Sequence, residues 1–323
     1  MDKILLTGCC GFIGSKVTAN LLQEGYQVLG LDEMNTSYDI SLKEYRLQQL
    51  QSNKNFSFIK QNIAEPETVE IVKSFSPTII FNLAARAGVR VSIIDPFVYF
   101  RSNLIGTINL LQATKDYGVK KFILSSTSSV YAGEAMPFSE DLPVNRPISP
   151  YAASKKSAEV TCYTYHYLYG IDVTILRYFT VYGPAGRPDM SIFKFIKLID
   201  EGKEIIVFGD GTQSRNFTYI NDIADGTVRA LKLNGFNTVN LGGDKTNTLN
   251  ELISLIEHYL NKKASISYRK FEKTDIYATK ADIRRAKQLL NWEPKTSLDE
   301  GVKNTVAWYK ENYSWTKDIH LKE

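Results

Sequence analysis

The sequence predicts an α/β protein: a doubly wound parallel sheet of the Rossmann type with a smaller C-terminal α/β domain. In the N-terminal half, short apolar runs bounded by turn residues alternate with longer stretches of helical period, which is the pattern of βαβ units. After Gly183-Pro184 the chain changes to glycine-containing loops and shorter elements. We therefore expect a first domain over residues 1–182 and a second over 183–323, with one strand near 238–243 that can return to the main sheet.

The individual elements follow from the same alternation. The predicted strands are Lys3–Thr7, Gln27–Asp32, Phe56–Lys60, Thr78–Leu83, Lys121–Ser125 and Asp172–Tyr178. The predicted helices include Phe12–Glu24, Val98–Tyr117 and Tyr151–Tyr169. The last two are long and rich in apolar and aromatic side chains, so we expect a homodimer that buries them.

Composition narrows the class of protein. A chain of 323 residues, 43% hydrophobic and 23% charged, can bury one or two cores. Three cysteines do not make a disulfide framework, and no apolar run reaches the ~18 residues of a membrane span, so we expect a cytoplasmic protein. The net charge of +4 is spread along the chain, which argues against a nucleic-acid partner and mildly favours an anionic small substrate.

A glycine-rich segment, Thr7-Gly8-Cys9-Cys10-Gly11-Phe12-Ile13-Gly14, follows the first strand and opens the first helix. Its glycines let a backbone approach a pyrophosphate at a helix N-terminus, although such a turn can also exist for tight packing alone. Asp32 ends the second strand. A carboxylate there can accept hydrogen bonds from both hydroxyls of an adenosine ribose, and it would repel a 2′-phosphate. The pair predicts NAD rather than NADP. Asn62 is either a contact to adenine or a loop asparagine exposed to solvent.

Ser149-Pro150-Tyr151-Ala-Ala-Ser-Lys155 has the features of a helix start, an N-cap serine followed by proline. Tyr151 and Lys155 then lie one turn apart on one face. A tyrosine titrates near pH ~10, but a neighbouring ammonium and a positive nicotinamide both favour the phenolate, which makes it a usable base. Taken alone, a tyrosine and a lysine four residues apart can also lie on a helix face that is exposed to solvent. A run of hydroxyls, Ser126-Thr127-Ser128-Ser129, follows the fifth strand at the sheet edge where ligands of open α/β sheets bind.

These four features, in this order, resemble the extended short-chain dehydrogenase/reductases over almost the whole chain. The resemblance implies an NAD-binding first domain and a second domain that binds a nucleoside diphosphate sugar. It also implies that Thr127 hydrogen-bonds the sugar O4, that Tyr151 is the catalytic base and that Lys155 binds the nicotinamide ribose. The contacts to NAD that it implies are Gly8, Gly11, Phe12, Ile13, Gly14, Asp32, Asn62, Ile63, Leu83, Ala84, Ala85, Asn103, Tyr151, Lys155 and Tyr178.

Within that superfamily the chain resembles the UDP-glucuronate 4-epimerases. Their pattern is matched by the segment from Asp32 to Leu47, by Ala87-Gly-Val-Arg90 and by the segment from Arg177 to Met190. Thr180 stands where epimerases of neutral sugars carry Asn, and it can also be read as an ordinary strand-end residue. The implied contacts to the UDP-sugar are Gly88, Val89, Arg90, Thr127, Ser128, Ser129, Thr180, Arg187, Gln213, Arg215 and Arg269, with Lys194 within reach.

The residues around Ser129 bear on the reaction type. Decarboxylases of the family place Glu at the position of Ser129, and 4,6-dehydratases place Asp-Glu at Ser128-Ser129, whereas this chain has no carboxylate there. That difference favours epimerisation. A UDP-glucose-type epimerase, a UDP-glucuronate decarboxylase and a non-catalytic NAD-binding protein remain as alternatives.

Two departures from the family pattern concern other positions. An extra alanine follows Tyr131, and Lys273-Thr274-Asp275 replaces the usual Pro-Gly-Asp, which leaves Arg269 as the candidate for the phosphate-binding arginine. His166, His258 and His320 lack ligand spacing, so we expect no metal.

Overall fold

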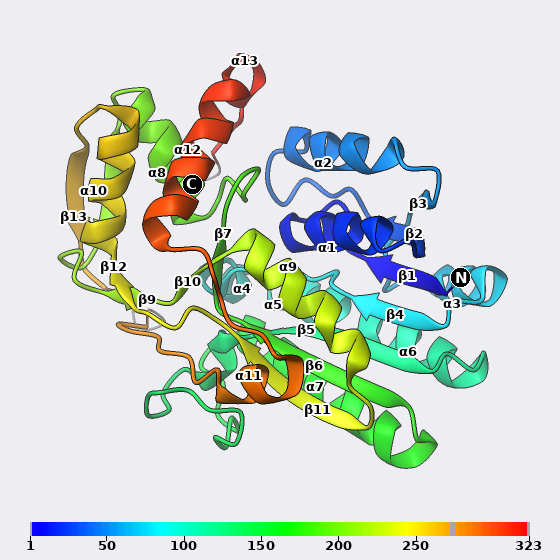
Figure 1. The fold of residues 1–323 in the computed structure, drawn as a ribbon. Helices are drawn as coiled ribbons and strands as arrows, with labels where there is room; N and C mark the ends of the chain where they lie inside the picture. Colours follow the sequence, from blue (N-terminus) through cyan, green and yellow to red (C-terminus); the bar gives the residue numbers. More distant parts are fainter. Residues whose placement is uncertain (1, 272–275, 322–323) are drawn as a thin grey trace.

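A seven-stranded parallel sheet forms the centre of the computed structural model, which describes residues 2–271 and 276–321 (Figure 1). The strand order is β11-β6-β5-β4-β1-β2-β3, so the chain winds outward in both directions from β1 and β4. The strands are β1 Lys3–Thr7, β2 Gln27–Asp32, β3 Phe56–Lys60, β4 Ile79–Asn82, β5 Lys121–Thr127, β6 Asp172–Tyr178 and β11 Phe236–Leu241. The predicted doubly wound α/β fold is confirmed.

Helices cover both faces of this sheet (Figure 1). One face carries α1 Phe12–Gln23, α2 Ser41–Gln51 and α9 Ile220–Arg229, and the other carries α3 Glu67–Phe75, α6 Gly106–Asp116 and α7 Pro150–Tyr169. Because side chains alternate along a strand, Ile4 and Leu6 of β1 enter the core of the first face while Leu5 enters that of the second. A strand buried on both sides must be apolar throughout, which is why β1 reads as a continuous apolar run.

The predicted helix Val98–Tyr117 is present as a continuous helical stretch, but it contains a π turn that the sequence did not predict. The stretch runs without a break through α5 Pro96–Phe100, the π-helical turn η1 over Arg101–Ile105 and α6. The turn contains Asn103, whose amide nitrogen donates to the Arg86 carbonyl at 3.0 Å and to Ser154 Oγ at 2.9 Å, while its oxygen accepts from the Arg86 nitrogen at 2.8 Å. A π turn inserts one residue into a helix, and here it coincides with an asparagine whose side chain links α7 to the segment after β4.

Beside the sheet, the described residues of the second half form a smaller unit of two-stranded pairs and helices (Figure 1). Its strands are β7 Thr180–Tyr182, β8 Glu204–Phe208, β9 Ser214–Arg215, β10 Phe217–Tyr219, β12 Asn247–Thr248 and β13 Ser265–Arg269. Its helices are α8 Ser191–Asp200, α10 Leu249–Leu260, α12 Leu298–Glu311 and the single turn α13 Tyr313–Thr316, whereas α11 Arg284–Leu290 packs on β11 and α9 of the main sheet. The remaining short elements are α4 Val89–Ile94, η2 Ser128–Tyr131 and η3 Ala230–Lys232.

The two units share an apolar core in which Phe12 of α1 and Leu42 of α2 pack with residues of α8, α10 and α12. The site residues therefore lie between elements that are fixed relative to one another. All three cysteines are buried and free. Across the described residues, no helix combines the length and the apolar character needed to cross a membrane.

Candidate active site

The glycine turn after β1 is packed too closely for side chains. Gly8 has φ +73°, and a Cβ on it would lie 2.7 Å from the Ala84 nitrogen at the end of β4. A Cβ on Gly14 would collide with the Gly8 carbonyl. The turn closes with a hydrogen bond of 2.9 Å from the Gly11 nitrogen to the Gly8 oxygen and leads directly into Phe12 of α1. The backbone at the N-terminus of α1 therefore carries no side chain at Gly8, Gly11 or Gly14, which suits the close approach of an anion.

Asp32 is buried at the end of β2 and is tied to this turn. Its carboxylate accepts hydrogen bonds from the Cys10 nitrogen at 3.2 Å and the Met34 nitrogen at 2.9 Å. It also forms an ion pair of 3.4 Å with Lys43 of α2. Lys43 was not identified from the sequence, because a lysine in the first turns of an amphipathic helix is usually exposed, whereas this one is 5% exposed.

Two other predicted cofactor contacts, Asn62 after β3 and Tyr178 at the end of β6, have polar side-chain atoms that already form hydrogen bonds. The Asn62 side-chain oxygen accepts from the Ala64 nitrogen at 2.9 Å, so Asn62 first of all shapes its own loop. The Tyr178 hydroxyl bonds Thr227 Oγ1 of α9 at 2.9 Å inside the core. The roles of Asn62 and Tyr178 toward a cofactor therefore stay predictions.

Tyr151 and Lys155 stand at the start of α7, as the sequence predicts for this helix. Ser149 caps the helix by accepting from the Ala152 nitrogen at 3.2 Å. Tyr151 is hydrogen-bonded to Thr127, the last residue of β5, and Lys155 Nζ lies 3.5 Å from Ser125 Oγ on the same strand. Thr127 in turn contacts Ser129 Oγ at 3.2 Å. The structure thus brings Thr127, Tyr151 and Lys155 together with the serine turn η2.

The pKa values of this pair reflect burial. Burial raises the pKa of Tyr151, while the hydrogen bond with Thr127 and the positive charge of Arg187 act to lower it. The sequence-based expectation that Lys155 supplies this effect differs from the structure, in which Arg187 is the cation that lowers the pKa of Tyr151. Burial lowers the pKa of Lys155 to about 8, and the Glu159 carboxylate opposes that shift.

A buried polar network lies behind the reactive residues. Glu159 accepts from Ser126 Oγ at 2.6 Å and from Arg177 at 2.9 and 2.7 Å. Arg177 also donates to the Tyr131 hydroxyl at 2.8 Å. This network anchors the end of β5 to α7 and β6. Glu159 was missed in the sequence, although its position one turn after Lys155 on a face of small residues was a signal that could have identified it.

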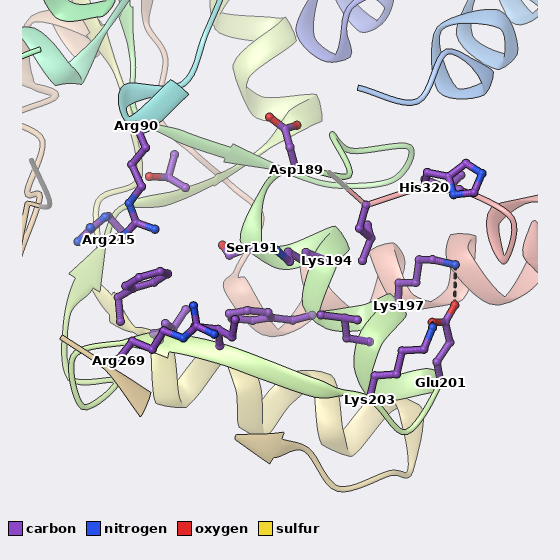
Figure 2. Close-up of a pocket in the computed structure, with 18 of the residues that line it drawn as sticks. Arg90, Asp189, Ser191, Lys194, Lys197, Glu201, Lys203, Arg215, Arg269 and His320 are labelled. Carbon is purple, nitrogen blue, oxygen red and sulfur yellow. Dashed lines mark ion pairs between the residues drawn. The ribbon is translucent and has the colours of Figure 1, made fainter. Parts of the chain in front are cut away.

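The predicted substrate residues of the second unit line a large cavity. It has a volume of about 1070 Å³, and its lining includes Arg90, Thr180, Gln213, Arg215 and Arg269, together with Lys194. In Figure 2, Arg90, Arg215 and Arg269 lie toward one end, and Lys197, Lys203 and His320 toward the other. This concentration of cations suits an anionic ligand such as a diphosphate.

The cavity also shows how some of these side chains are held. Gln213 donates to the Phe208 carbonyl at 2.7 Å, while its side-chain oxygen is buried without a hydrogen-bond partner. The Arg90 guanidinium lies 3.7 Å from the centre of the Phe208 ring, so it links α4 to β8. An unsatisfied buried oxygen calls for a donor, which a ligand could supply. Lys273, Thr274 and Asp275 lie outside the described residues.

Arg187 lies on the loop between β7 and α8, on the side of the site that faces Tyr151. Its guanidinium pairs with Asp189 at 3.0 and 2.5 Å. Across from it, Gly88 has φ +128° and precedes α4, so Val89 begins that helix. The Tyr99 ring, which was missed in the sequence, packs 6.1 Å from the Tyr151 ring.

Comparisons with known proteins agree with this geometry. The family model described as GDP-mannose 4,6 dehydratase matches residues 5–305. A UDP-glucuronate 4-epimerase of Thermodesulfobacterium geofontis is 53% identical over 323 residues, which span 99% of this chain and 100% of the relative.

Two solved structures are similar along their whole length. UDP-glucuronic acid 4-epimerase from Bacillus cereus, in complex with UDP-glucuronic acid and NAD, is 39% identical with a TM-score of 0.91, covering 96% of this chain and 100% of that one. UDP-glucose 4-epimerase from Thermotoga maritima, with UDP-glucose, is 33% identical with a TM-score of 0.87, covering 96% and 99%.

Proposed function

The chain belongs to the GDP-mannose 4,6 dehydratase family within the extended short-chain dehydrogenase/reductases, and on that premise we propose that it interconverts UDP-glucuronate and UDP-galacturonate through a transient 4-keto sugar. The observation that carries the proposal is the hydrogen-bonded pair of Tyr151 and Thr127 beside Ser128 and Ser129, a turn without a carboxylate. The protein is thus an NAD-dependent nucleotide-sugar 4-epimerase, an isomerase.

The residues around the glycine turn fit NAD. The turn leaves the N-terminus of α1 open to a diphosphate, and the Asp32 carboxylate stands beside it, held by Cys10 and Lys43. NAD, when bound, accepts the hydride from C4 of the sugar and returns it to the opposite face, so no net oxidation results. We propose that the predicted contacts hold this cofactor; they lie in the glycine turn and the start of α1, at the end of β2, after β3 and β4, in η1, on α7 and at the end of β6.

The reactive residues then divide the proton chemistry. Tyr151 takes the proton from the sugar O4 as C4 is oxidised and gives it back when C4 is reduced. Thr127 holds Tyr151 and the O4 in one line of hydrogen bonds, and Lys155 places a positive charge beside the nicotinamide ribose. Because burial raises the pKa of Tyr151, the phenolate depends on the positive charges around it, of which Arg187 is one.

Oxidation at C4 of a uronate creates a β-keto acid, which loses CO₂ when the C5–C6 bond lies parallel to the carbonyl π system. The site must hold the carboxylate away from that alignment. We propose Ser128, Ser129 and Thr180 as hydroxyl donors and Arg187 as the cationic donor for this purpose. A carboxylate at Ser129 would repel the substrate carboxylate, so its absence fits a uronate that must keep its carbon skeleton.

We propose that residues 1–182 with β11 form the NAD-binding domain and residues 183–323 the UDP-sugar-binding domain, working as a homodimer in the cytoplasm. The dimer is supported by exposed apolar and aromatic side chains on α7, namely Val160, Tyr163, Tyr167, Leu168 and Tyr169. Sedimentation velocity of the parent and of Tyr167→Glu tests it: a monomeric parent contradicts the dimer, and a monomeric variant supports this face.

Product analysis tests the function. Purified protein is incubated with UDP-glucuronate and, separately, with UDP-glucose, without added cofactor, and products are separated by chromatography. The expected result is conversion of UDP-glucuronate to UDP-galacturonate with only the NAD⁺ that the purified protein carries. Exclusive turnover of UDP-glucose, a UDP-pentose as the main product, a strict need for NADP⁺, or accumulation of free NADH would each contradict the proposal.

A further inference from the structure

The segment between β2 and the end of α2 contributes two buried side chains that the proposed reaction leaves without a role. Tyr38 is 5% exposed and Arg46 is 3% exposed. Both belong to the stretch from Asp32 to Leu47, which matches the family pattern. They lie where the glycine turn meets the loop between β7 and α8.

Arg46 joins these two segments directly. Its guanidinium donates to the Cys10 carbonyl of the glycine turn at 3.1 Å, and to the Ala185 carbonyl of the loop at 3.1 and 2.6 Å. It also donates to the Tyr38 hydroxyl at 2.7 Å and stacks over the Phe12 ring at 5.8 Å.

The hydrogen-bond acceptors of Arg46 within the described residues are neutral oxygens, since its remaining bond is to the Gly186 carbonyl at 3.4 Å. A buried guanidinium without a carboxylate partner costs stability relative to an apolar side chain of similar size. The burial of Arg46 is therefore better explained by the segments that it positions than by a contribution to the stability of the core.

The loop needs this support. Ala185 has φ +54°, a left-handed conformation that is strained for a residue with a side chain and that persists only when its surroundings impose it. The two hydrogen bonds to its carbonyl provide such a constraint. Arg187 follows two residues later, and its guanidinium lies 5.6 Å from the Tyr38 ring, while that of Arg46 lies 5.7 Å from the same ring. The Tyr38 ring therefore contacts both cations.

We propose that Arg46 and Tyr38 are positioning residues that hold the Arg187 loop against the cofactor-binding turn and so fix the place at which Arg187 meets the substrate carboxylate. The inference deepens the proposed function and depends on it for the chemistry of the carboxylate. It assigns a role to neither residue in the proton or hydride transfer. It links the two ends of the site, because one guanidinium donates to both Cys10 of the glycine turn and Ala185 of the loop.

The test compares Arg46→Met with the control Tyr45→Phe. Tyr45 is the neighbouring residue of α2 but bonds Trp308 of α12 and has no bond to the turn or the loop. Arg46→Met should lower kcat for UDP-glucuronate by about threefold to tenfold, since displacing a substrate-positioning group slows turnover. It should also release a UDP-pentose by-product. Tyr45→Phe should behave like the parent.

Two further variants separate positioning from general damage. Tyr38→Phe keeps the ring and loses one acceptor, so its by-product share should lie between those of the parent and Arg46→Met. Arg46→Lys restores a cation that can reach one carbonyl and should recover part of the clean product ratio. Thermal unfolding of Arg46→Met should show a moderate loss of stability, since the Cys10 and Ala185 carbonyls lose their donor. Arg46→Lys and Tyr38→Phe, which lose fewer of these bonds, should unfold closer to the parent.

Hydrogen–deuterium exchange of the 183–190 peptide gives a readout independent of the substrate. Exchange should rise in Arg46→Met and stay unchanged in Tyr45→Phe. If the parent fails to epimerise UDP-glucuronate while exchange rises as expected, the proposed function fails and the structural link stands. Unchanged exchange together with an unchanged product ratio in Arg46→Met would overturn the inference.

Discussion

The two sides of the reaction site are built in different ways. On one side, Thr127, Tyr151 and Lys155 stand on β5 and α7, two regular elements joined by the buried hydrogen bond from Ser126 to Glu159. On the other side, Arg187 stands on a loop, paired with the exposed Asp189 and held by contacts with residues more than a hundred positions away. In the proposed mechanism, the first side determines whether C4 is oxidised, and the second determines whether the oxidised sugar keeps its carboxylate.

The largest effect is expected on the first side. Tyr151→Phe should lower kcat by about 10²-fold or more, because it removes the proton acceptor, while leaving bound NAD nearly unchanged. Turnover is measured with UDP-glucuronate, and retained NAD is measured after heat release from the purified protein. Near-normal turnover would show that another group is the base. The side formed by β5 and α7 would then not be the one that controls oxidation at C4.

Lys155 on the same side should produce a smaller effect that depends on pH. Burial lowers the pKa of Lys155 to about 8, so its ammonium is present below that pH and is lost as the pH rises. If the ammonium binds the nicotinamide ribose, NAD affinity should fall through pH 8 in the parent, and Lys155→Met should weaken it by about tenfold at pH 7, near 1.4 kcal/mol.

The control for this prediction is the shape of the titration. Lys155→Met should show a flat NAD affinity between pH 7 and 9, measured by fluorescence titration with NADH. A parent affinity that is equally flat over this range would mean that Lys155 does not contact the cofactor as a cation.

The loop side should change the product more than the rate. Arg187→His or Thr180→Ala should slow epimerisation only partly, by about tenfold or less, because the base and the cofactor stay in place. Both should let some of the 4-keto uronate lose CO₂. UDP-galacturonate, UDP-pentose and NADH are quantified from each variant. If both variants epimerise as fast and as cleanly as the parent, other residues hold the carboxylate.

The same contrast explains what the sequence could predict. The β5 and α7 residues were found because strands, caps and helix periodicity are local signals: Ser149-Pro150 predicts the helix start and thereby the spacing of Tyr151 and Lys155. The π turn around Asn103 was not predicted, because it depends on contacts with Arg86 and Ser154 from other elements.

Long-range contacts account for the other omissions. Lys43, Arg46 and Glu159 are charged residues on helices, which local pattern places at the surface, yet tertiary partners bury all three. For Arg46 the partners include Cys10 and Ala185, which lie on either side of it in the chain and come together only in the folded protein. The residue pattern from Asp32 to Leu47 therefore does not predict that Arg46 contacts Cys10 and Ala185.

The smallest expected effect concerns Asp189 and refines the account of the loop. In the structure the Asp189 carboxylate accepts from Nε and Nη2 of Arg187 at 3.0 and 2.5 Å, and so competes with the proposed substrate carboxylate for this guanidinium. Both side chains are partly exposed, so their pairing contributes at most about 1 kcal/mol. Asp189→Asn removes a competing carboxylate but keeps the shape of the side chain. It should lower KM for UDP-glucuronate by up to about fivefold, with kcat nearly constant. The inhibition constant of UDP-glucose, which has no carboxylate, should not change. A higher KM for UDP-glucuronate would instead show that Asp189 orients Arg187 for binding, and the loop would then be held by its own ion pair as well as by Arg46.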